Sequence, residues 1–130
     1  MSTDSQLQND CIEWRRLAES EGEAIRARNW SLVAECQTAL RQLQPRIARH
    51  ALDARKEWMR LGPIRKEKES SFRATLQSLI EIGVSNRAIL DRLRETARSN
   101  ISQLEQAGRN LRKIHRFYSR SVPSTWSSVS

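Results

Sequence analysis

The stretch that most constrains the fold runs from Ile64 to Tyr118 and contains no proline. Apolar residues recur along it in steps of three and four, a spacing that predicts one continuous amphipathic helix. The residues on this seam are Phe72, Leu76, Leu79, Leu90, Leu93, Ala97, Leu104, Leu111 and Tyr118, with gaps filled by Gly83, Asn86, Asn100 and Gly108. Further isoleucines widen the stripe, which favours a bundle core over a narrow two-stranded coil. At about 1.5 Å per residue the helix would be roughly 80 Å long, so something must cover its apolar face.

The first half of the chain predicts two shorter helices, at about residues 5–28 and 31–61. The expected core face of the first helix consists of Leu7, Cys11, Trp14, Leu17, Ala18, Ala24 and Ile25, with Glu19, Glu21 and Glu23 mostly outside. The expected core face of the second consists of Val33, Cys36, Leu40, Leu43, Ile47, Ala51, Ala54, Trp58 and Leu61. Both sets follow helical periodicity, so both helices should pack against the long one.

The helix boundaries are marked by residues that favour caps and turns. Thr3 or Ser5 is expected to cap the first helix, and Asn29 or Ser31 the second. Pro45 falls inside the second helix, where it predicts a kink near residues 41–44 rather than a break. The pair Gly62-Pro63 should end the second helix and begin the third, because glycine suits the residue after a helix and proline its first turn.

The fold class that follows is all-α: an elongated antiparallel bundle of three helices, the third very long. The length of 130 residues suits one domain, expected over residues 1–118. A hydrophobic share of 38% and an aromatic share of 5% fit an extended bundle with much exposed surface. The serine-rich segment 119–130 is expected to be a flexible tail, with Trp126 as its one strong anchor.

Helix lengths predict that the end of the long helix lacks a cover within the chain. The second helix would span only about 46 Å, and the first is shorter. Beyond about Asn100 the apolar spacing nevertheless continues, through Ile101, Leu104, Ala107, Leu111, Ile114, Phe117 and Tyr118. An uncovered apolar stripe indicates either a site for a partner or a seam for a homodimer.

The formal net charge of +8 raises nucleic acid or an anionic membrane as partners. Basic and acidic residues mostly alternate, which is typical of a solvated helix surface. The segment from Arg109 to Arg120 is an exception, since it carries five basic residues and no acidic one. No nucleic-acid recognition motif is present, so a basic nucleic-acid-binding protein is kept as an alternative and regarded as unlikely.

No catalytic or metal-binding pattern stands out. His50 and His115 each lie among arginines and are expected at the surface or its boundary. The four glycines are isolated, and no Glu-x-x-His pair or Cys-x-x-Cys motif occurs. We therefore expect a protein that is not an enzyme and that uses no metal or cofactor. Cys11 and Cys36 are expected to behave as small buried hydrophobes.

The start of the chain is polar and acidic, unlike a signal peptide. No apolar run approaches the roughly 20 residues needed to span a bilayer, so a cytoplasmic protein without membrane insertion is expected. Trp14, Trp30 and Trp58 fit core or corner positions.

Four residues on the seam of the long helix leave their roles open. Asn86 and Asn100 could be boundary residues bonded to water, or buried polar residues that set the helix register. Gly83 and Gly108 could allow close helix approach or simply lower helix stability.

The second helix begins near "ARNWSLVAECQTALRQLQPRI", and the long helix carries "NRAILDRLRETARSNISQLEQAGRNLRKIHRFY". In these two stretches the chain resembles the flagellar export chaperones of the FlgN type. The family's "(D/N)-x-x-x-L" start of the second helix is matched at residues 29–33, with Val33 in place of leucine. Its "N-x-x-(I/L)-L" is matched by Asn86, Ile89 and Leu90. Its closing aromatic is matched by Phe117 and Tyr118.

This resemblance implies a chaperone that binds the C-terminal amphipathic helices of flagellar hook-associated (junction) proteins. It would keep them from assembling prematurely and deliver them to the export gate component of the type III secretion apparatus. The implied client-binding residues are Ile101, Leu104, Ala107, Leu111 and Ile114, and the implied contact to the export gate is Tyr118. A structural coiled-coil module that forms a homodimer through the same residues is the other alternative.

Overall fold

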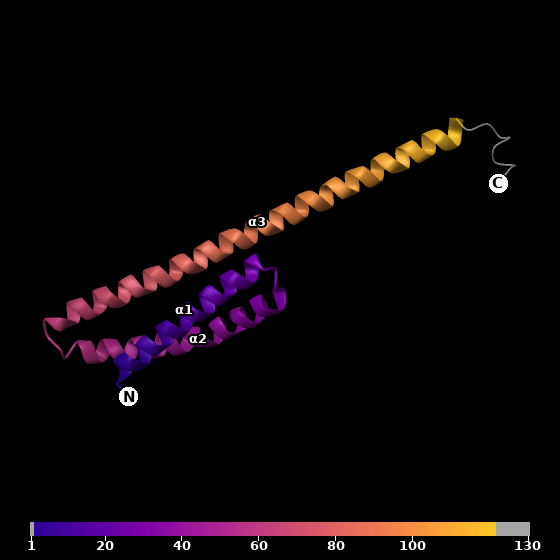
Figure 1. The fold of residues 1–130 in the computed structure, drawn as a ribbon. Coiled ribbons are helices and arrows are strands. Elements are labelled where there is room, and N and C mark those ends of the chain that lie inside the picture. The colour runs from indigo at the N-terminus through magenta and orange to yellow at the C-terminus, as the bar shows by residue number, and fades with distance from the viewer. Residues whose placement is uncertain (1, 122–130) are drawn as a thin grey trace. The chain divides into compact units, whose positions relative to one another are not determined.

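The computed structural model describes residues 2–121, with side chains described through residue 119. Three helices, α1 (Thr3–Arg26), α2 (Trp30–Trp58) and α3 (Ile64–Ser121), make up nearly all of it (Figure 1). This part of the chain contains no strand, which confirms the prediction of an all-α fold of three helices. Trp126 and the rest of the expected tail after Ser121 lie outside the described residues.

The described part of the chain forms two compact units. The boundary falls inside α3, between Leu90 and Asp91. The first unit contains α1, α2 and the first part of α3, and the second contains the remainder of α3.

The start of α1 differs from the prediction. Ser2 caps the helix, because its hydroxyl accepts a hydrogen bond from the backbone N–H of Ser5 at 3.2 Å. Thr3 and Ser5, the expected caps, are helical residues instead. The serine reaches the orphan N–H three residues on, as an N-cap does. The expected cap of α2 is confirmed, since Asn29 Oδ1 accepts from the N–H of Leu32 at 3.3 Å.

The turn between α1 and α2 places a non-glycine residue in the left-handed region. α1 ends at Arg26, and Arg28 has a φ of 55°. The N–H of Asn29 reaches back to the carbonyl of Ala24 at 2.9 Å, which closes the helix as a Schellman motif does. At the next turn, Gly62 has a φ of 66°, which glycine tolerates. α2 ends at Trp58 rather than at Leu61, so Gly62-Pro63 lies within the turn and the prediction that this pair ends the helix is wrong.

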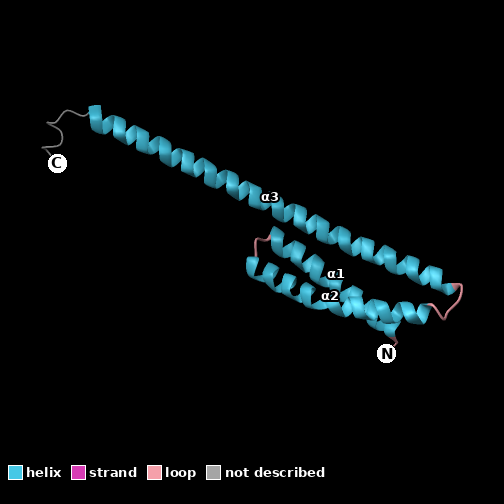
Figure 2. Ribbon diagram, turned by 180° about the vertical axis from the view of Figure 1, so that it is seen from behind, coloured by secondary structure: helices cyan, strands magenta, loops and turns pink. Residues whose placement is uncertain are grey.

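Polar contacts between the helices of the first unit show their directions. Asp4, Arg15 and Ala18 of α1 bond to Lys68, Ser78 and Asn86 of α3. Because both sets of numbers increase together, α3 runs parallel to α1. α2 runs antiparallel to both, as its short connections require, and lies beside α1 in both views (Figures 1 and 2).

One hydrophobic cluster joins the three helices of the first unit. Its buried members are Leu7, Cys11, Leu17, Leu43, Ile47, Ala54, Trp58, Phe72 and Leu79. The rings of Trp58 and Phe72 meet edge to face, with centroids 6.0 Å apart. Burying each large side chain contributes roughly 1.5–3 kcal/mol, so this cluster stabilises most of the unit.

Most of the core residues predicted for α1 and α2 are buried. Trp14, Leu40 and Ala51 are partly buried, and Leu61 and Trp30 are exposed. Leu61 is 45% exposed, because α2 ends at Trp58 and Leu61 belongs to the turn that follows. Trp30 is 49% exposed at the first position of α2, so its expected packing over the corner is wrong. Cys11 and Cys36 are both buried thiols, as predicted.

A buried polar cluster also corrects the prediction that Glu21 lies outside. Asn86 is 4% exposed, and its Nδ2 donates to the Ala18 carbonyl at 2.7 Å and to Glu21 Oε1 at 3.1 Å. Glu21 is buried with it. Asn86 is therefore bonded to protein groups of α1 rather than to water, whereas Asn100 is exposed. The side chain lies so close to Gly22 that a Cβ there would meet Asn86 Oδ1 at 2.6 Å.

Candidate functional site

The residues predicted to bind a client all lie in the second unit, on the part of α3 after Asp91. Ile101, Leu104, Leu111 and Ile114 are 56%, 72%, 66% and 51% exposed, and Ala107 is exposed as well. A helix turns about 100° per residue, which places these residues within an arc of about 140°. We call these five residues the apolar face. Large aliphatic side chains that share one face and remain exposed mark an interaction surface.

Gly108 interrupts the apolar face with a shallow hollow. Ile101, Leu104, Glu105, Arg109 and Arg112 line this hollow together with the glycine. A Cβ built on Gly108 meets nothing within 4 Å. No other helix therefore packs closely against Gly108 within the described residues. The hollow offers room for a large side chain from a partner helix.

The aromatic pair near the end of α3 is exposed too. Phe117 and Tyr118 are 68% and 62% exposed, and their rings meet edge to face at 6.0 Å. Tyr118 falls within the arc of the apolar face, whereas Phe117 lies about 100° away from Tyr118. The predicted contact of Tyr118 with an export gate remains a prediction.

A neighbouring side of the same segment is basic. Arg109, Arg112, Lys113 and Arg116 are exposed and follow the spacing i, i+3, i+4, i+7, which places them within an arc of about 100°. We call these four residues the basic face. Arg109 Nη2 donates to Gln106 Oε1 at 2.7 Å. None of the four forms an ion pair with a carboxylate among the residues whose side chains are described. The side chain of Arg120 lies outside that range.

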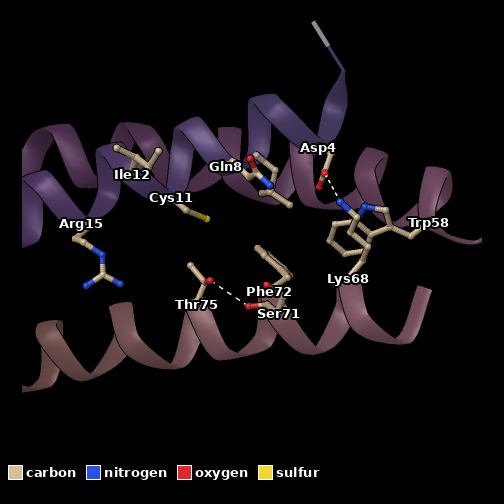
Figure 3. A pocket seen from close by; sticks show the side chains of 11 residues that line it. Asp4, Gln8, Cys11, Ile12, Arg15, Trp58, Lys68, Ser71, Phe72 and Thr75 are labelled. Atoms are coloured by element: carbon tan, nitrogen blue, oxygen red, sulfur yellow. Dashed lines mark hydrogen bonds and ion pairs between the residues drawn. The ribbon is translucent and has the colours of Figure 1, made fainter. Parts of the chain in front are cut away.

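The first unit contains a cavity of about 320 Å³ between α1 and α3 that the sequence did not predict (Figure 3). Its polar groups largely satisfy one another: Lys68 Nζ lies 2.8 Å from Asp4 Oδ2, and Thr75 Oγ1 donates to the Ser71 carbonyl at 3.0 Å. Trp58 lines the cavity, and its buried indole N–H has no hydrogen-bond partner among the described residues. Polar and apolar residues both line this cavity, and its acid and base pair with each other, so it presents no reacting pair.

The chemistry of Cys11, which lines this cavity, supports that interpretation. Burial raises the pKa of the Cys11 thiol above its ordinary value, and the negative charge of Asp10 raises it further. A thiol in such surroundings stays protonated and is a poor nucleophile. No histidine lines the cavity to serve as its base.

Sequence reasoning missed a second buried carboxylate, Asp10. It is 5% exposed, accepts from Arg46 Nε at 3.0 Å and contacts the His50 ring through Nδ1. Arg46 and His50 lie one turn apart on α2, and that spacing was the only available signal. His50 is partly buried, as a boundary histidine should be. Because both partners come from the neighbouring helix, the cluster joins α1 to α2.

Within the described chain, no three His, Cys, Asp or Glu side chains are grouped so that they could hold a metal ion. None of the three described helices combines the length and apolar content needed to cross a bilayer. Comparison with known protein families, with characterised proteins and with solved structures finds no significant match.

Proposed function

We propose that this chain is an export chaperone of the flagellar type III system. It binds the C-terminal amphipathic helices of hook-associated (junction) subunits on its apolar face, which keeps them from assembling in the cytoplasm. Tyr118 then contacts the export gate component. The observation that supports the proposal is the exposure of Ile101, Leu104, Leu111 and Ile114, each by more than half, on one side of a helix.

The apolar face suits an amphipathic helix as its partner. Its residues recur at helical spacing, so a second helix laid alongside would contact them in turn. At about 25 cal/mol per Å², covering each of the four large side chains would contribute about 2 kcal/mol before the cost of association. A client segment that is disordered when free would lose part of this gain on ordering, which permits later release.

The residues along the seam favour a different protein over a second copy of this chain. Ile101, Gly108 and His115 occupy one heptad position, and Leu104, Leu111 and Tyr118 the other. A parallel, in-register homodimer would set Gly108 against Gly108 and His115 against His115, leaving a gap and two polar rings in the seam. A client helix with a large side chain opposite Gly108 would bury more apolar surface.

The test is direct binding of the full chain to purified hook–filament junction subunits, followed by size-exclusion chromatography and calorimetry. We expect a complex whose affinity falls by at least about 100-fold in the double variant Leu104→Asp/Leu111→Asp, because two buried carboxylates would replace two apolar contacts. The matched control is Ile80→Asp/Val84→Asp, which changes exposed apolar residues of the first unit and should bind normally.

Two results would overturn the proposal. One is the absence of any complex with junction subunits. The other is an equal loss of affinity in the control variant, which would move the binding surface away from the apolar face.

Self-association through the apolar face is the second candidate, supported by its heptad spacing. Light scattering of the isolated wild-type chain distinguishes the two. A dimer that the Leu104→Asp/Leu111→Asp variant abolishes would favour a coiled-coil module, whereas a monomer favours the chaperone.

A further inference from the structure

We propose that the basic face of α3 docks on an anionic lipid surface while the apolar face of the same segment points away from it. The two faces share no residue, although Arg109 and Arg112 of the basic face also line the hollow beside Gly108. The inference does not require a client to be bound.

The basic face carries more positive than negative charge, since Glu105 is the one carboxylate within its arc. Arg109, Arg112, Lys113 and Arg116 lie three or four residues apart, so neighbouring cations repel one another along the helix. No described carboxylate forms an ion pair with any of them, and Glu105 is the one acidic residue from 101 to 119. A surface that carries fixed negative charges would remove this repulsion and release counterions.

The arrangement of the four cations fits a planar surface. They occupy an arc of about 100° and extend for roughly 10 Å along the helix. A flat surface laid against a helix contacts the residues of one such arc and leaves the rest of the helix free. The major groove of a nucleic acid, only about 12 Å wide, would instead place phosphates on both sides of the helix. One side here is the apolar face, so a planar anionic surface fits better than a duplex.

The arc of the basic face contains no large apolar residue. Ser102 and Glu105 are the other residues whose side chains point there, so this face has no group to insert among acyl chains. Docking would therefore be electrostatic. It should weaken steeply with salt, since the Debye length is only about 8 Å at physiological ionic strength.

The experiment is co-sedimentation of the full chain with vesicles of phosphatidylcholine and phosphatidylglycerol in a ratio of about seven to three, beside vesicles of phosphatidylcholine alone. We expect binding to the anionic vesicles at low salt, little binding to the neutral ones, and loss of binding at high salt. The variant Arg112→Glu/Lys113→Glu/Arg116→Glu should bind at least about 100-fold more weakly, since each cation near such a surface contributes about fivefold.

The matched control reverses three exposed cations elsewhere, as Arg49→Glu/Arg60→Glu/Arg73→Glu. It changes the net charge by the same amount. Its affinity for anionic vesicles should fall less than about tenfold, because these residues lie outside the basic face. An equal loss would show that net charge alone binds the vesicles and would overturn the proposal.

Two further arms complete the test. The uncharged variant Leu104→Ser/Leu111→Ser should keep its vesicle binding, and its loss would show that the apolar face inserts, against the proposed orientation. A short DNA duplex should bind more weakly than the anionic vesicles at the same salt. Tighter duplex binding, lost in the triple variant of the basic face, would replace the lipid surface by nucleic acid.

Discussion

Asn86 shows how one side chain can define the alignment of two helices. Its amide donates to a backbone carbonyl and to a carboxylate of α1, both one turn or less from Gly22. Moving α3 by one turn would leave a buried amide and a buried carboxylate unpaired, which costs several kcal/mol. The absence of a side chain at Gly22 makes room for this contact.

Gly22→Ala is expected to destabilise the first unit by about 1–2 kcal/mol, even though alanine favours a helix by about 1 kcal/mol over glycine. The added Cβ would lie 2.6 Å from Asn86 Oδ1, whose side chain is held by two hydrogen bonds. The measurement is urea unfolding followed by circular dichroism.

The matched control is Gly83→Ala. A Cβ there meets nothing within 4 Å, so the free energy of unfolding of this variant should rise by about 0.5–1 kcal/mol. If both variants shift stability in the same direction, the proposed tight contact at Gly22 is absent in solution.

Among the helices, α2 is continuous through a proline. It runs from Trp30 to Trp58 with Pro45 inside, which confirms that the proline does not divide it into two helices. The kink expected at residues 41–44 remains a prediction. Leu43 and Ile47, on either side of Pro45, are both buried, so the packing of their side chains offsets the lost backbone hydrogen bond.

Pro45→Ala is expected to stabilise the protein by about 1–3 kcal/mol, because the ring is exposed and its replacement restores a backbone donor. Urea unfolding measures the change, with Gln44→Ala, at a neighbouring exposed position, expected to stay within about 0.5 kcal/mol of wild type. Destabilisation by Pro45→Ala would mean that a bend at this proline is needed to place Leu43 and Ile47 in the core.

On the scale of the whole molecule, the two units differ in how their helices are stabilised. The first unit buries the hydrophobic cluster around Trp58 and Phe72. From residue 91 to residue 119, by contrast, no side chain is buried. An isolated helix in water is only marginally stable, so this part of α3 depends on local propensity until a partner covers it.

Hydrogen exchange should therefore be at least about 100-fold faster over residues 95–119 than over residues 7–25 in the isolated chain. Addition of a bound client helix should slow exchange in the first of these segments and leave the second unchanged. Mass spectrometry of peptic fragments measures both. Equal protection of the two segments in the isolated chain would show that the apolar face is already covered, as in a homodimer.

Local patterns in the sequence predicted the three helices, their approximate boundaries and most of the buried faces. They could do so because periodicity and caps such as Asn29 each act within a few positions of the chain. Tertiary structure alone decided which residues of different helices meet. Periodicity predicted Glu21 outside and did not decide whether Asn86 is buried. The structure buries both residues together beside Gly22. It likewise brought Asp10 to Arg46 and His50. The physical reason is that a helical pattern tells which side of a helix is apolar but carries no information about the position of its neighbour along the axis.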